Sequence, residues 1–181
     1  ESWVLERRVL NEEDFARLHH VRILLEVAGL VQRRKGVFRR TRRRAQLALA
    51  ERAGVLFAGL VGTHFRTCNL AYLDGAGPAP GFQYTIAYAL SRFGTVGDAW
   101  TVPGELTRPL LLPLVRDELA ADAPYDRGAL VLETRCLRPL EGFGLAGARE
   151  AAPAPGEVLR HRAYRKTALF DRLFRFALPA S

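Results

Sequence analysis

Apolar residues recur at helical spacing along most of the chain, which predicts a mainly helical protein. In the first such segment, Phe15, Leu18 and Leu25 fall on one face. Asn11 and the acidic residues after it suit a helix start. Gly29 suits the end of this helix, because glycine readily takes the left-handed conformation that closes helices. The pattern therefore predicts a helix that begins near Asn11 and ends before Gly29.

Two short strands are predicted next, over residues 30–34 and 37–40. The tight turn Lys35-Gly36 joins them, and glycine supplies the positive φ that such a turn needs. Thr41 is then expected to cap a second helix. This part of the chain is thus predicted to be a helix, a hairpin and a helix.

The middle of the chain is predicted to be helical, with interruptions at glycines and prolines. One helix is expected over residues 82–93. Another is expected to begin at Pro103 and to run to about Leu119. Pro109 and Pro113 are expected to kink or divide it, because proline lacks the N–H of a helical residue.

The end of the chain repeats the order of its beginning. A predicted helix over residues 129–143 is followed by Gly144, a longer hairpin and Thr167, which is expected to cap the last helix. We therefore predict an internal duplication in which Gly29 corresponds to Gly144 and Thr41 to Thr167. The alternative is that two helix–hairpin–helix segments share this order by chance.

The sequence Ala-Gly-Leu-Val at residues 28–31, the hairpin after it and Thr41 resemble the winged helix-turn-helix domains of bacterial regulators. In that family a helix ends in such a sequence motif, a two-stranded wing follows, and a Thr begins the next segment. Gly144 and the residues after it fit the pattern more loosely. The resemblance covers residues 11–50 and 128–176. The chain also resembles uncharacterised bacterial open-reading-frame proteins, which imply no activity.

The predicted fold is mainly α with short β-hairpins, and consists of two winged-helix-like units joined by a helical middle segment. The predicted boundaries are residues 1–60 for the first unit, 61–127 for the connecting segment and 128–181 for the second unit. A winged helix has two helices before the one that ends at the wing, and only one precedes Gly29. Because the chain contains no Met, we expect it to be a piece of a longer protein, so the missing helices could lie upstream. Alternatively, the middle helices could take their place.

The charge is positive at both ends of the chain and slightly negative between them. The formal net charge is +8, of which residues 1–60 contribute +6, residues 61–127 contribute −2 and residues 128–181 contribute +4. A nucleic acid or an acidic protein would therefore meet the ends rather than the middle.

Eight cations fall within twelve residues around the first hairpin, with no acidic residue among them. They are Arg33, Arg34, Lys35, Arg39, Arg40, Arg42, Arg43 and Arg44. Like charges repel, and cations in the first turn of the helix expected after Thr41 would oppose its dipole, so a bound phosphate would relieve both penalties. The resemblance implies the same partner, because the wing of that family contacts the DNA backbone. The alternatives are a solvated basic face in a protein of GC-rich coding, pairing with acids of the middle segment, or an acidic protein partner.

Base-specific contacts would fall to exposed side chains on the helix before Gly29. The candidates are Arg17, His20 and Arg22. Single-stranded stacking is not favoured, because Phe38 is the lone aromatic residue of the basic segment.

The sequence holds no motif for catalysis or for a cofactor. His64 and Cys68 have the spacing of half a zinc site, but no second pair accompanies them, so no metal is expected. Cys68 and Cys136 are expected to be reduced and mostly buried. The longest uncharged run, residues 53–65, is shorter than the ~20 residues of a membrane span.

We therefore expect a cytoplasmic, non-enzymatic bacterial protein that binds duplex DNA as a regulator does and contacts phosphates through its Arg-rich wing. The alternative is a protein-interaction scaffold of tandem winged helices, whose acidic middle segment could pair with the basic ends on self-association. No membrane contact is expected.

Overall fold

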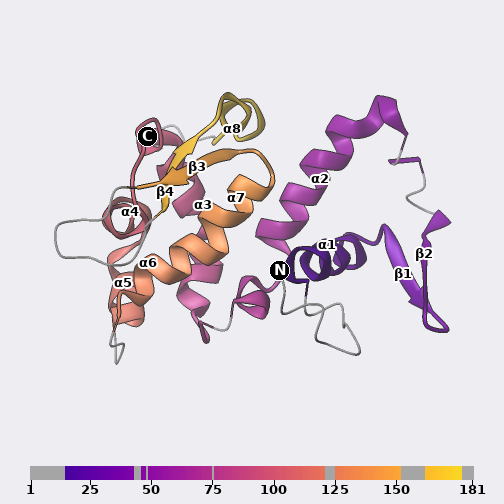
Figure 1. The fold of residues 1–181 in the computed structure, drawn as a ribbon, viewed down its shortest axis with the longest axis horizontal. Helices are drawn as coiled ribbons and strands as arrows, with labels where there is room; N and C mark the ends of the chain where they lie inside the picture. The colour runs from indigo at the N-terminus through magenta and orange to yellow at the C-terminus, as the bar shows by residue number, and fades with distance from the viewer. Residues whose placement is uncertain are drawn as a thin grey trace. The chain divides into compact units, whose positions relative to one another are not determined.

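The computed structural model describes residues 15–42, 46–47, 49–74, 76–120, 125–151 and 162–176. Its fold is mainly helical with two antiparallel hairpins, which confirms the predicted fold class. The chain divides into two compact units, Glu1–Cys68 and Asn69–Ser181. Each unit has its own helices and its own hairpin (Figure 1).

The first unit consists of two helices and the hairpin between them in sequence. In chain order the elements are α1 (Ala16–Val27), β1 (Val31–Arg34), β2 (Val37–Arg40) and α2 (Ala53–Arg66). Helix α1 packs against α2. Leu24 and Ala28 from the first part of the unit and Val61 and Phe65 from α2 are buried. The predicted helix before Gly29 and the predicted hairpin are confirmed, while the start predicted for that helix lies outside the described residues.

Thr41 does not begin an α-helix. Its N–H donates to the Leu30 carbonyl at 2.9 Å and its hydroxyl donates to the Gly29 carbonyl at 2.7 Å, so the side chain is not available as a helix cap. Arg42 lies in a 3₁₀ turn, and α2 begins only at Ala53. For the described residues, the prediction of a helix from Thr41 with cations in its first turn is therefore wrong.

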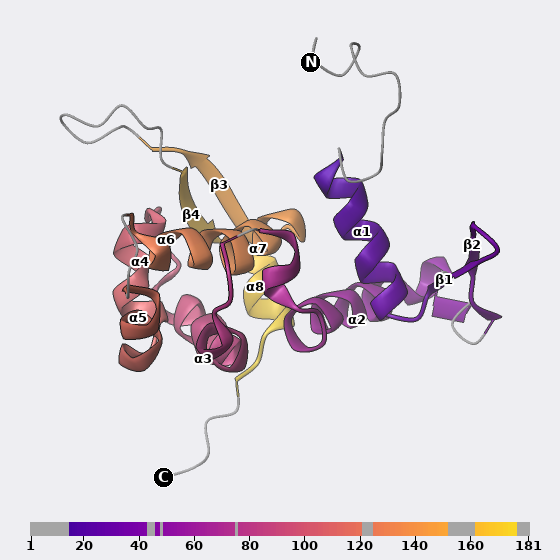
Figure 2. The same ribbon diagram turned by 90° about the horizontal axis from the view of Figure 1, so that it is seen from below.

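The second unit contains the remaining helices and the second hairpin. Its elements are α3 (Pro80–Val96), α4 (Pro103–Leu110), α5 (Pro113–Ala120), α6 (Arg127–Leu132), α7 (Arg138–Gly142), β3 (Ala146–Glu150), β4 (Arg162–Lys166) and α8 (Ala168–Leu173). The hairpin β3–β4 lies beside α7 (Figures 1 and 2). Helix α3 is longer than predicted, because Gly94 continues it. The ring of Phe170 packs close to this glycine, where an added Cβ would lie 3.3 Å from it.

Prolines shape the helices of this unit. Pro113 divides the long helix predicted from Pro103, because it occupies the first position of α5, where a missing N–H leaves no bond unmade. Pro109 stays within α4. A π-helical turn over Glu133–Leu137 joins α6 to α7 in one unbroken coil (Figure 1). Pro139 follows this turn and cannot donate to the carbonyl four residues before it, and the wider turn accommodates that loss.

A third segment joins the second hairpin. Thr101 pairs with Tyr164 of β4 through two backbone hydrogen bonds of 3.1 and 2.9 Å, and the Gly97 carbonyl accepts a bond of 2.7 Å from the Lys166 N–H. The Tyr164 side chain is completely buried, and its hydroxyl donates to Glu133 at 2.9 Å. In the first unit, by contrast, β1 is the one strand of the described residues that pairs with β2.

A buried ion pair fixes the loop before α3 to the π-helical turn. The Arg135 guanidinium contacts Asp74 through Nε, and its Nη2 donates to Asp74 at 3.0 Å and to the Gly77 carbonyl at 2.5 Å. The Thr134 hydroxyl also donates to Asp74, at 3.2 Å. Burial raises the pKa of Asp74, but the hydrogen bonds from Arg135 and the Ala76 N–H outweigh it, so this pKa lies below its ordinary value.

The two hairpins begin with the same helix ending. Gly29 and Gly144 have φ values of 68° and 70°. Each glycine N–H donates to the carbonyl three residues earlier. The N–H of the next residue donates to the carbonyl five residues earlier, at 2.9 Å for Leu30 and 2.8 Å for Leu145. This pair of bonds defines the Schellman motif.

The two hairpins also end in the same way. The Thr167 N–H donates to the Leu145 carbonyl at 3.0 Å, and the Thr167 hydroxyl donates to the Gly144 carbonyl at 2.8 Å. Thr41 makes the corresponding two bonds in the first unit. The predicted correspondence of the two glycines and of the two threonines is therefore confirmed. We call this set of bonds between the glycine, the following leucine and the threonine the glycine–threonine brace.

Candidate nucleic-acid interface

The hairpin β1–β2, which we call the basic wing, turns at two residues with positive φ. Lys35 has a φ of 52° and Gly36 a φ of 78°. These values fit a type I′ turn, whose twist matches that of the paired strands. Arg33 lies opposite Phe38 in the antiparallel register. Because opposite residues share a face and neighbours along a strand alternate, the cations of the wing are divided between two faces.

The cations of the wing are exposed on both faces. Arg34 and Arg39 lie on one face, and Arg33 and Arg40 lie on the other with Phe38. Six cations of the predicted cluster are described, and none forms an ion pair with a carboxylate of the described residues: Arg33, Arg34, Lys35, Arg39, Arg40 and Arg42. The other two, Arg43 and Arg44, lie outside the described residues.

Phe38 belongs to the surface of the basic wing rather than to the core. Its side chain is 43% exposed. The guanidinium carbons of Arg22 and Arg33 lie 5.8 and 5.9 Å from the centroid of its ring. Both distances allow cation–π attraction. An aromatic ring is thus set among cations on this face.

The three side chains predicted to contact bases differ in their surroundings. Arg17 is exposed on α1. Arg22 is half-buried and pairs with Glu26 at 2.7 Å. His20 turns toward α2, where its Nε2 lies 3.1 Å from Nδ1 of His64. His20 is thus half-buried, as Arg22 is, because its ring packs against α2, and base contacts by His20 stay a prediction. Base contacts by Arg17 and Arg22 stay a prediction.

The histidine pair between α1 and α2 is held in a neutral form. Burial and the charge of His19 lower the pKa of His20, and burial and the charge of His20 lower the pKa of His64 to about 3. One ring nitrogen of the pair can then donate to the other. The pair joins the two helices of the first unit. Among the described residues, no group of three or more His, Cys, Asp or Glu side chains is arranged to hold a metal ion.

The two cysteines differ in burial. Cys136 is completely buried in the π-helical turn, and burial raises the pKa of its thiol to about 12. Cys68 is only partly buried. The expectation of mostly buried thiols is therefore confirmed for Cys136, while Cys68 reaches solvent.

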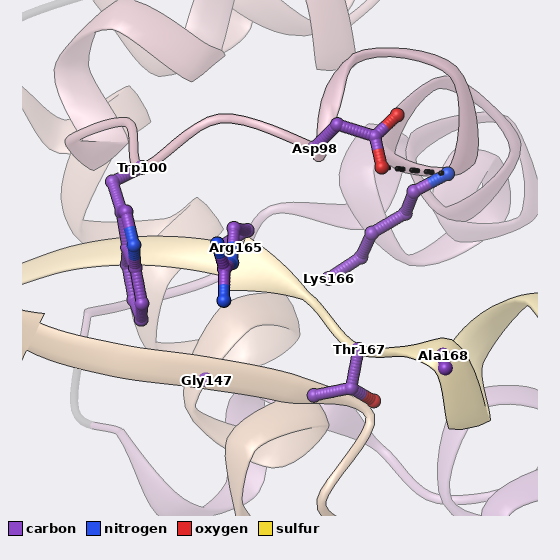
Figure 3. A pocket seen from close by; sticks show the side chains of 7 residues that line it. All are labelled: Asp98, Trp100, Gly147, Arg165, Lys166, Thr167 and Ala168. Carbon is purple, nitrogen blue, oxygen red and sulfur yellow. Dashed lines mark ion pairs between the residues drawn. The ribbon is translucent and has the colours of Figure 1, made fainter.

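Two arginines of the second hairpin contact an aromatic ring, that of Trp100, which lies in the segment before α4. The guanidinium carbons of Arg149 and Arg165 each lie 4.8 Å from the centroid of the Trp100 ring. The indole packs on Gly147, where an added Cβ would come within 3.2 Å of the ring. Arg165 lies beside Trp100 at a pocket of about 370 Å³ (Figure 3). Glycine in β3 thus makes room for the indole.

Lys166, at the edge of this pocket, is neutralised by neighbouring acidic groups. Its Nζ donates to the Gly94 carbonyl at 2.7 Å and pairs with Asp171 at 3.1 Å. It also pairs with Asp98 at 3.4 Å, as Figure 3 shows. Arg40 occupies the corresponding position of the basic wing, opposite the first residue of its partner strand. The two hairpins therefore share a backbone design but differ in how their cations are compensated.

The contacts of Trp100 cannot be predicted from the local sequence. Its partners Arg149 and Arg165 are far from it in sequence, and only the pairing of Thr101 with β4 brings them together. The order shared by the two ends of the chain could have marked the arginines that stand at equal positions in the two hairpins, but it carries no signal for Trp100.

Comparison with known proteins reports a similarity for the first unit. A family model described as the Y4jL N-terminal domain matches residues 2–54, which include α1 and the basic wing. No curated protein and no solved structure matched the chain. Within the described part of the chain, no helix combines the length and the apolar character needed to cross a membrane.

Proposed function

We propose that this protein binds duplex DNA through the basic wing, as a cytoplasmic, non-enzymatic regulator does. The observation that carries the proposal is the set of six exposed cations of the wing, none of which pairs with a carboxylate of the described residues. Cations at this density repel one another. The phosphates of a duplex would remove that repulsion, and the counterions they release would add to the affinity.

The glycine–threonine brace supports the proposal, because it fixes both ends of the wing to the end of α1. Cations on a fixed hairpin keep their spacing when they meet a regular row of phosphates. The resemblance of the first unit to winged helix-turn-helix domains points the same way, since the wing of that family contacts the DNA backbone. In this proposal Arg17 and Arg22 contact base edges and the wing sets their position.

The test compares two variants that each lose two arginines from the first unit. R39A/R40A removes charge from the wing, and R52A/R66A removes the same charge from exposed positions at the ends of α2. Fluorescence anisotropy of a labelled duplex is measured over a salt series. The log–log slope should fall by about 0.9 for each phosphate contact that R39A/R40A loses. R52A/R66A should keep the wild-type slope.

Two outcomes would contradict the proposal. One is the absence of binding by the wild type at low salt, and the other is an equal change of slope in both variants. Thermal melts of R39A/R40A provide a further check, because removing mutual repulsion should not lower stability. A clear loss of stability would show that these arginines are paired within the fold. The exposed Val37 and Phe38 would then favour the second candidate, a scaffold that binds a protein through the same hairpin.

A further inference from the structure

Each hairpin contains a pair of arginines, and the two pairs stand at corresponding positions of their hairpins. Arg34 of the basic wing and Arg149 of the second hairpin each stand five residues after the glycine of the brace. Arg39 and Arg165 each stand two residues before the threonine. The strand registers agree as well, since Arg39 lies opposite Gln32 as Arg165 lies opposite Gly147. Each pair therefore occupies the same face of its hairpin.

In the second hairpin this pair of arginines holds an aromatic ring. Both guanidinium groups lie 4.8 Å from the centroid of the Trp100 ring, a distance at which a cation is attracted to a ring face. Figure 3 shows the Arg165 guanidinium group alongside the indole. In this hairpin two arginines so placed hold a planar aromatic group above Gly147, a position that Gln32 takes in the basic wing.

In the basic wing the corresponding arginines, Arg34 and Arg39, hold no aromatic ring of the described residues. Both side chains are exposed. The face is also free of acidic partners among the described residues. A ligand with an aromatic plane and negative charge would satisfy both features of this face at once.

We propose that Arg34 and Arg39 bind an unpaired nucleobase as Arg149 and Arg165 bind the Trp100 ring. Planar guanidinium groups stack on base faces, and the phosphates that accompany a base would meet the other cations of the wing. A protein aromatic side chain would fill the same plane but would leave those cations without counter-charge. The inference rests on the proposed function and deepens it. The preferred target is DNA in which unpaired bases adjoin duplex, because bases inside a duplex already stack on each other.

The test uses two labelled duplexes that each contain a short single-stranded gap. In one the gap carries adenines, and in the other it carries abasic residues, so the phosphates are identical. The wild type should bind the adenine gap about fivefold more tightly or better, as expected for one stacked base. R34K/R39K keeps the charge but loses the planar groups, so the two affinities should become equal while the salt slope stays. The matched control R33K/R40K, on the opposite face, should keep the preference.

The outcomes separate this inference from the proposed function. Equal affinity of the wild type for both gaps would overturn base binding and leave duplex binding intact. No binding to either gap or to continuous duplex would overturn both. A preference that R34K/R39K keeps, or that R33K/R40K loses, would show that the base does not lie between Arg34 and Arg39.

Discussion

Arg135 is a charged residue with only 2% of its surface exposed, in a helix that is otherwise apolar at its buried positions. Its guanidinium group is tolerated there because Asp74 balances the charge and the Gly77 carbonyl takes a further hydrogen bond. Such a pair need not stabilise the fold more than two apolar side chains in its place would. Removal of one partner, however, leaves a buried charge without compensation. The stability of this buried site therefore depends on a hydrogen-bond or charge partner for each polar atom more than on the number of contacts.

D74N should therefore destabilise the second unit strongly. The asparagine amide cannot balance the buried guanidinium charge, so the free energy of unfolding should fall by about 3 kcal/mol or more. Chemical denaturation measures the loss. The matched control is D126N, in which an exposed helix cap is exchanged for a residue that caps equally well. A D74N variant as stable as D126N would refute this account of the ion pair.

At the scale of elements, the sequence predicted those features that depend on near neighbours. The helix before Gly29 and the turn at Lys35-Gly36 follow from local spacing and from residues suited to positive φ. The equal roles of Gly29 and Gly144 followed from the order of the chain alone. For the cations of the basic wing the sequence left open both exposure and pairing with acidic residues of the middle segment, and the described cations are exposed.

The predictions failed where a side chain bonds to a distant partner. Thr41 suits a helix cap by its type, but its hydroxyl donates to a carbonyl twelve residues earlier. The local pattern also does not indicate that His20 meets His64 from α2. Trp100 reaches its arginines only through strand pairing at Thr101. Helical periodicity contains no information on such long-range contacts.

The glycine–threonine brace can be tested through its two hydroxyl groups. T41V and T167V keep the shape of the side chain but leave the Gly29 or Gly144 carbonyl without its hydroxyl donor. Loss of this bond should cost about 1 kcal/mol. Hydrogen exchange should accelerate in the adjoining hairpin, β1–β2 for T41V and β3–β4 for T167V. The control T95V removes an exposed hydroxyl that bonds within helix α3, and both hairpins should then exchange at the wild-type rate. Unchanged exchange in T41V and T167V would show that the hydroxyls do not hold the hairpins.

At the scale of the whole molecule, the two compact units should differ in their response to acid. The first unit contains His64, whose pKa burial lowers to about 3, whereas an unfolded histidine has a pKa of about 6.5. His20, from α1, faces this ring, and His19 acts on His20 in turn. Because the folded pKa is the lower one, the stabilising contribution is complete above the unfolded pKa and is lost as the pH falls toward the folded pKa.

The first unit should therefore lose stability between pH 6.5 and pH 4, by about 1.4 kcal/mol for each pH unit. Chemical denaturation at a series of pH values, followed by NMR signals assigned to each unit, measures the effect. H64L removes the titrating group and should flatten the profile of the first unit over this range. Signals from the second unit should change little in either protein. A wild-type profile that H64L leaves unaltered would contradict the assignment.

The glycine–threonine brace has a consequence for which changes of sequence the hairpins can accept. Its bonds involve the residues that flank a hairpin, not the strands or the turn between them. The same brace holds a two-residue turn in one unit and a much longer connection in the other. The hairpin between these bonds can therefore differ in length and sequence while the bonds stay the same. Grafting a different segment between Leu30 and Thr41 should give a folded protein with altered contacts to DNA, because the helices and the bonds of the brace stay in place.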